Sequence, residues 1–185
     1  PDLKTFLAQQ RITVTRVKHP VAYTAQEIAA AQHVPGKQLA KCVLVRTNQG
    51  VRLVVLPAVY RVDFAKLKKL LNAKSLILAS EADIQQAFPG VEVGAMSVFG
   101  NLYSIPVIVD KSLAASPDIV CNAGTHSETI KLRYRDFERV VKPKVGSFVA
   151  APPRPAKAAR KKGASHSRTR RASRPRPRKS PKKTR

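Results

Sequence analysis

The amino-acid composition changes abruptly after residue 150. Residues 151–185 contain six prolines and 15 Lys or Arg, with no Asp, Glu, Leu, Ile, Phe or Tyr. Such a segment has almost nothing to bury and its charges repel one another, so it is predicted to be a disordered Lys/Arg/Pro-rich tail. Residues 1–150 are long enough to bury a core and are predicted to form a single domain.

The charge of the chain indicates a polyanionic partner. The net charge is +24, of which the tail carries +15 and residues 1–150 carry +9. An excess of this size favours nucleic acid over an acidic protein as the partner. The tail is predicted to be a non-specific arm that condenses onto phosphates, and the alternative is a passive solubilising segment.

The two cysteines and the N-terminal residues indicate the cellular compartment in which the protein is expected. Cys42 and Cys121 lie among apolar residues without CxxC or His-spaced neighbours, so neither a zinc site nor a disulfide framework is predicted. The first residues lack the order of a signal peptide, and no stretch approaches the roughly 20 apolar residues of a membrane span. We therefore expect a soluble, cytoplasmic protein without a metal, a cofactor or a membrane partner, and no pattern specifies an oligomeric state.

Helical and strand patterns alternate irregularly along residues 1–150. The clearest signals are the capping box formed by Thr24 and Glu27 and the turn residues 48–50 between two apolar runs. Helices are predicted over residues 2–10, 24–32, 63–71, 80–88 and 136–141. Strands are predicted over residues 12–17, 39–45, 51–56, 75–79, 102–109, 119–121, 130–132 and 145–149. This order favours an α/β domain with a central mixed, partly barrel-like sheet flanked by helices, and not a doubly wound fold.

Lys41 is the one charge in the apolar run of residues 39–45. That run predicts a strand buried on both faces. An ammonium group without a partner is costly to bury, so two interpretations remain open. Either the side chain extends along the apolar surface to water, or its charge faces an anionic ligand in a pocket.

Two further segments carry residues suited to a site. Gly94 and Gly100 bracket a loop that can fold tightly and aim backbone amides at a ligand oxygen, although a plain tight turn explains the same glycines. His126 follows Gly124 at the entry of a predicted strand. A histidine at that position either serves a site or is simply bonded to a backbone carbonyl.

Six short phrases, in order, resemble the YbaK family of aminoacyl-tRNA deacylases, which includes the editing insertion of bacterial prolyl-tRNA synthetase. The resemblance covers about residues 19–149. The phrases are YTAQE at 23–27, VPG at 34–36 with AK at 40–41, VLPA at 55–58, FPG with EVGAM within 88–96, FGNLY at 99–103 and NAGTH at 122–126.

The resemblance implies trans-editing, the hydrolysis of the ester between a wrong amino acid and the terminal adenosine of tRNA. Lys41, Gly94 and His126 match the family's lysine, glycine loop and histidine, and are the predicted catalytic residues. In this scheme Lys41 holds ribose or phosphate oxygens of the terminal nucleotide, and backbone amides near Gly94 to Met96 stabilise the developing oxyanion. Water or a ribose hydroxyl is the expected nucleophile, not a cysteine. The predicted substrate-binding residues are His19, Tyr23, Ala95, Met96, Gly124 and Thr125.

One departure from the family pattern leaves a second function open. The family loop usually carries two prolines where this chain has Ser97 and Val98, and proline would restrict the backbone that presents the amides. The alternative is therefore a catalytically inactive protein of the same fold that binds tRNA or other nucleic acid. A small-molecule hydrolase is a third possibility. Family substrates are small amino acids such as alanine, cysteine, serine and threonine.

Overall fold

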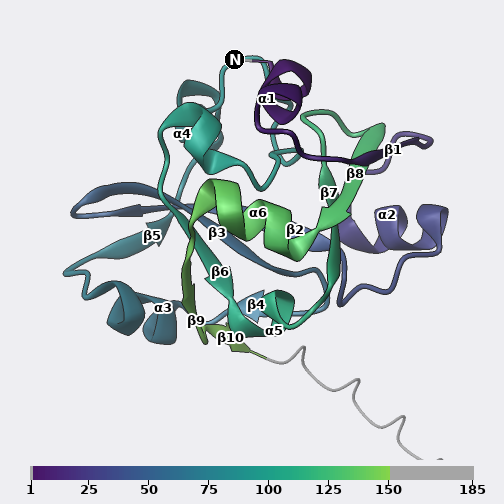
Figure 1. The fold of residues 1–185 in the computed structure, drawn as a ribbon. Coiled ribbons are helices and arrows are strands. Elements are labelled where there is room, and N and C mark those ends of the chain that lie inside the picture. The colour runs from purple at the N-terminus through teal and green to yellow at the C-terminus, as the bar shows by residue number, and fades with distance from the viewer. Residues whose placement is uncertain (1, 151–185) are drawn as a thin grey trace, which may run out of the picture. The chain divides into compact units, whose positions relative to one another are not determined.

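The computed structural model describes residues 2–150, so the predicted disorder of the tail lies outside the described residues (Figure 1). This part of the chain forms a mixed α/β domain, as the sequence predicts. The helices are α1 (Leu3–Gln9), α2 (Ala25–Gln32), α3 (Phe64–Leu71), α4 (Glu81–Ala87), α5 (Lys111–Ala114) and α6 (Tyr134–Val141), with a 3-10 helix η1 (Gly100–Tyr103). No helix within residues 2–150 has the length and apolar character needed to cross a membrane.

The larger sheet has five strands in the order β5-β2-β3-β6-β9. The antiparallel hairpin predicted across residues 48–50 is present as its centre. One outer strand pairs with this hairpin in the antiparallel direction, and two others continue the sheet in parallel. Its strands are β2 (Ala40–Thr47), β3 (Gly50–Pro57), β5 (Leu76–Leu78), β6 (Val107–Asp110) and β9 (Lys144–Gly146). The sheet is therefore mixed, as predicted.

The other strands form two smaller, antiparallel sheets. One has the order β1-β8-β7 and the other pairs β10 with β4. Their strands are β1 (Thr15–Lys18), β7 (Asp118–Asn122), β8 (Glu128–Arg133), β4 (Arg61–Val62) and β10 (Val149–Ala150). A single isolated bridge between Leu39 and Val120 links the three-stranded sheet to the strand that follows Leu39. The prediction of a partly barrel-like sheet was wrong, because β5 and β9 remain at opposite edges and the described strands do not close.

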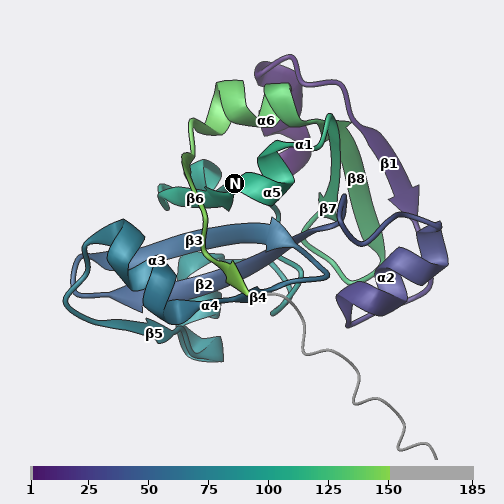
Figure 2. The ribbon, with the colours of Figure 1, turned by 90° about the horizontal axis from the view of Figure 1, so that it is seen from below.

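The core lies on both faces of the five-stranded sheet, which explains the apolar runs at residues 42–45 of β2 and 53–56 of β3. Along β3, Leu53 and Val55 point into one cluster with α1, α5 and α6. Val54 and Leu56 point into a second cluster, with Leu67 of α3 and Phe148. Figure 2 shows α1 and α6 on the same side of the β2–β3 hairpin. Lys41 is therefore a charged residue beside the buried part of β2, whereas the other charge of this strand, Arg46, is exposed.

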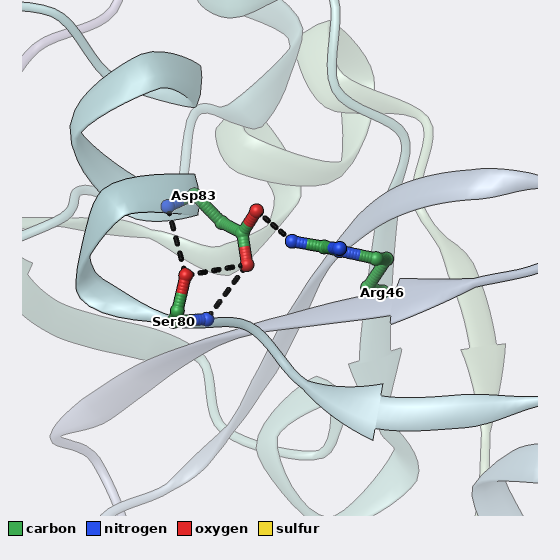
Figure 3. Close-up of polar contacts among 3 residues, drawn as sticks. All are labelled: Arg46, Ser80 and Asp83. Atoms are coloured by element: carbon green, nitrogen blue, oxygen red, sulfur yellow. Dashed lines mark hydrogen bonds and ion pairs between the residues drawn. The ribbon is translucent and has the colours of Figure 1, made fainter.

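The capping box predicted at Thr24 and Glu27 is confirmed. Ser80 forms a second complete capping box at the start of α4, and Asp63 caps α3. In the second capping box, Arg46 of β2 also bonds the Asp83 carboxylate, which ties α4 to the sheet (Figure 3). Hydrogen bonds, first from Ser80 and then from Arg46, hold the pKa of Asp83 below its usual range.

Two predicted strands were wrong in part. Over residues 102–109 only β6 is extended, because the chain first turns through η1, where the Ile105 amide returns to the Gly100 carbonyl at 2.9 Å. The closing strand over residues 145–149 is split between β9 and β10. At the split, the Phe148 amide donates to the Asp110 carboxylate at 2.8 Å, so the chain leaves one sheet and joins another.

Candidate active site

A pocket of about 210 Å³ opens between α2, β2, the loop at Gly94 and the end of β7. Three of the predicted site residues, Tyr23, Lys41 and Gly94, line this pocket together. Its remaining lining is mostly apolar and comes from α2 and β2, with one polar side chain from β7. The full lining is Tyr23, Ile28, Leu39, Ala40, Lys41, Cys42, Gly94 and Asn122.

Lys41 lies half-buried at the start of β2, and its Nζ donates a hydrogen bond to the Tyr60 carbonyl at 2.7 Å. Burial, and after it the nearby Arg61 charge, holds the pKa of Lys41 below the usual lysine range. An ammonium group has three N–H donors, so two are left for a ligand in the pocket. The lysine therefore has a backbone partner and also faces a cavity, an arrangement that neither sequence interpretation described.

The loop at Gly94 adopts a backbone conformation that favours glycine, with φ of +89°. The Ala95 amide donates to the Glu92 carbonyl at 2.9 Å, so it closes a turn and is not free for a ligand. Among residues 2–150, no backbone carbonyl accepts from the amides of Gly94 and Met96. Of Gly94 and Met96, only Gly94 lines the pocket. Both Ala95 and Met96 are buried.

His126 lies behind the loop and does not line the pocket. Its ring Nε2 is 2.9 Å from the Val93 carbonyl, which can only accept, so the proton is assigned to Nε2. Its backbone amide donates to the Glu92 carboxylate at 2.7 Å, and its ring lies against that of Tyr23 with centroids 4.8 Å apart. A Cβ atom on Gly94 would be 3.4 Å from the His126 ring. His126 thus lies against both the loop at Gly94 and the Tyr23 ring, outside the pocket lining.

The remaining predicted residues lie elsewhere. The buried His19 points its ring Nδ1 at the Pro20 carbonyl, 2.8 Å away, and contributes nothing to the pocket lining. Gly124 and Thr125 line a separate cavity of about 160 Å³, together with Ser97. Ser97 and its neighbour Val98 are buried, so packing restrains the loop segment where the family pattern has prolines.

Asn122 lines the pocket and is not among the residues predicted from the sequence. Its Nδ2 donates to the Gly94 carbonyl at 3.4 Å. Its Oδ1 is buried and has no hydrogen-bond partner within residues 2–150. The sequence contains a signal for this position, because a polar residue there follows the apolar run of residues 119–121 and comes shortly before Gly124. A buried acceptor beside Lys41 suits a ligand that carries N–H or O–H donors.

Neither cysteine is suited to act as a nucleophile. Cys42 lines the pocket, but burial raises its pKa well above that of a free thiol. Burial also raises the pKa of Cys121 to about 12. Both thiols are therefore protonated at neutral pH, and the protonated form is a poor nucleophile. Within the part of the chain that the structure describes, no three His, Cys, Asp or Glu side chains are grouped to hold a metal ion.

Comparison with known proteins identifies relatives of this chain. Residues 19–140 match the family described as the aminoacyl-tRNA editing domain. The prolyl-tRNA editing protein ProX of Acetoanaerobium sticklandii is 27% identical over 150 residues, which cover 78% of this chain and 91% of ProX. Proline–tRNA ligase of Xanthomonas campestris pv. campestris is 30% identical over 111 residues, which cover 60% of this chain and 20% of the ligase.

Solved structures share the fold. One is described as a candidate trans-editing enzyme for prolyl-tRNA synthetase; it is 19% identical, with a TM-score of 0.71 over 80% of this chain and 95% of that chain. Another, the hypothetical protein APE2540, is 19% identical with a TM-score of 0.73 and covers 80% and 99% of the two chains. At this level of identity the likeness concerns the fold.

Proposed function

This chain belongs to the aminoacyl-tRNA editing domain family, and we propose that it is an aminoacyl-tRNA deacylase that acts in trans on mischarged tRNA. The observation that carries the proposal is the pocket in which Lys41 of β2 faces Gly94 and Asn122. These residues come from three distant parts of the chain, carry polar groups and line one small cavity. The name of the ProX relative, a prolyl-tRNA editing protein, supports the same substrate class.

The reaction is an ester hydrolysis. A water oxygen attacks the carbonyl carbon of the aminoacyl ester, negative charge collects on the carbonyl oxygen, and the bond to the ribose oxygen then breaks. The attacking water gives up a proton and the departing ribose oxygen takes one up, which leaves a free amino acid and a free tRNA end. A donor aimed at the carbonyl oxygen accelerates this reaction, and the Gly94 amide is our candidate for that donor. The free N–H groups of Lys41 are suited to hold ribose or phosphate oxygens in register.

The size and lining of the pocket support a small amino acid as the group removed. About 210 Å³ is below the roughly 300–1,000 Å³ of pockets that enclose drug-sized ligands, so a nucleoside and a large side chain would not both fit. Ile28, Leu39 and Ala40 give one wall an apolar surface. We propose alanine, cysteine, serine or threonine esters as the class to be tested.

A screen of tRNAs mischarged with these four amino acids tests the proposal. We expect the full chain to release one or more of them in single-turnover assays, faster than the spontaneous hydrolysis of the same ester. A binding protein without catalytic activity would hold the charged tRNA and leave the rate of ester loss at the spontaneous value or below it. That outcome with all four esters would overturn the proposed deacylase activity.

Gly94→Ala is expected to lower kcat/KM for deacylation at least tenfold. The added methyl group would contact the His126 ring at 3.4 Å, and φ of +89° is strained for alanine, so the backbone amide would move. Gly50→Ala is the matched control, because Gly50 also has a positive φ, of +101°, but lies in the β2–β3 turn. Steady-state kinetics measures the loss of activity in each variant, and thermal unfolding measures the loss of stability. Together they separate an effect on the site from the general cost of a strained backbone. Equal losses of activity in the two variants would remove Gly94 from the site.

A further inference from the structure

Beside the three-stranded sheet lies a further concavity of about 510 Å³, which we call the basic groove. We propose that the basic groove binds the sugar-phosphate backbone of the RNA strand whose aminoacylated end enters the pocket. The inference rests on the proposed function and adds the surface that holds the rest of the substrate. The charged residues of the basic groove are Arg11, Lys131, Arg133, Arg135, Asp118 and Asp136.

Strand alternation explains why cations gather there. In β8, Ile130 and Leu132 point into the core, whereas Lys131 and Arg133 are exposed on the opposite face. Pairing with β7 places Asp118 opposite Arg133. At the Thr129 end of β8, α2 covers that face. Its Gln32 accepts a hydrogen bond from the Thr129 hydroxyl, and Figure 2 shows α2 beside this end of the strands. The end of the face that carries Lys131 and Arg133 forms the basic groove.

Most of these cations are available to a ligand. Lys131 pairs with Asp118 at 3.2 Å, and Asp136 pairs at 3.9 Å with Arg139, which does not line the groove. Within residues 2–150, the exposed side chains of the three groove arginines form no ion pair and no hydrogen bond. These three arginines are Arg11, Arg133 and Arg135. Guanidinium groups bind phosphate oxygens through two parallel hydrogen bonds, so the basic groove suits a phosphate backbone better than an apolar or cationic partner.

The basic groove and the pocket are within reach of one RNA strand. Asp118 begins β7 and lines the groove, whereas Asn122 ends β7 and lines the pocket. The four steps between them span about 13 Å at roughly 3.3 Å per residue. A stacked nucleic acid strand has one phosphate about every 3.4 Å, so in a stacked strand about four nucleotides separate a phosphate in the groove from an end in the pocket.

Binding of uncharged tRNA tests the basic groove without relying on catalysis. The double variant Arg133→Gln/Arg135→Gln is expected to weaken binding by on the order of tenfold and to reduce the slope of log K against log salt by about 1 to 2. Lys68→Gln/Lys69→Gln on α3 is the matched control, since it removes the same charge from exposed positions outside the groove and the pocket. All variants keep residues 151–185. Equal binding by the two double variants would overturn the proposal.

Aminoacylated oligonucleotides of different length test the reach. For a dinucleotide ester, we expect the groove variant and the unmodified chain to hydrolyse with the same kcat/KM. For a hexanucleotide ester, we expect the groove variant to show a roughly tenfold higher KM with unchanged kcat. An equal KM for the hexanucleotide would also overturn the proposal. If no ester is hydrolysed by the unmodified chain, the proposed function fails, and the tRNA-binding comparison still decides whether the groove binds RNA.

Discussion

Replacing Lys41 with methionine is expected to lower kcat/KM for deacylation by on the order of 100-fold, because a charged donor to the substrate would be lost from the pocket. Methionine keeps an unbranched apolar side chain against the strand surface and removes only the ammonium group. The Tyr60 carbonyl would lose its 2.7 Å partner, at a cost of about 1 kcal/mol in the free energy of unfolding. Single-turnover kinetics with a mischarged tRNA measures the loss.

Lys37→Met is the matched control for this experiment. Lys37 is exposed, precedes the same strand and does not line the pocket. We expect it to retain the activity of the unmodified chain, within about twofold, because a solvated surface charge contributes little to a site it does not touch. If both lysine variants hydrolyse the ester equally well, Lys41 has no part in catalysis, and the pocket would have to be reassigned.

Replacing Asp110 with alanine is expected to lower the free energy of unfolding by about 3 kcal/mol. The carboxylate is 2% exposed and joins three structural elements. Its Oδ1 accepts from the Ser112 amide at 2.9 Å at the start of α5, and its Oδ2 accepts from the buried Phe148 amide at 2.8 Å. Removing it would leave the buried Phe148 donor without its partner, where the chain passes from β9 to β10.

Urea unfolding, followed by far-UV circular dichroism, measures this change. Ser112→Ala is the control, because it deletes only the hydroxyl that donates to the same carboxylate at 2.5 Å and leaves both backbone bonds in place. We expect it to cost about 1 kcal/mol. A loss for Asp110→Ala no larger than that of the serine variant would show that the carboxylate does not hold the β9–β10 connection.

Local patterns were sufficient for much of the fold. Thr24 with Glu27, and Ser80 with Asp83, satisfy helix amides within three residues, so the chain near each cap specifies the start of a helix. The β2–β3 hairpin was likewise predictable from its turn residues and its apolar runs. In contrast, the split between β9 and β10 depends on the bond from the Phe148 amide to Asp110, which lies 38 residues earlier in the chain, and periodicity does not report such a bond.

The candidate site shows the same division. The sequence by itself marked Lys41 as an unusual charge and Gly94 as a residue that permits unusual torsions, since both properties belong to the residue and its immediate neighbours. Only the tertiary structure decided that Tyr60 provides the lysine's carbonyl partner, that Asn122 completes the pocket, and that His126 stands behind the loop. The physical reason is that these contacts join segments far apart in the chain, and their geometry is determined by how the sheets and α2 pack against one another.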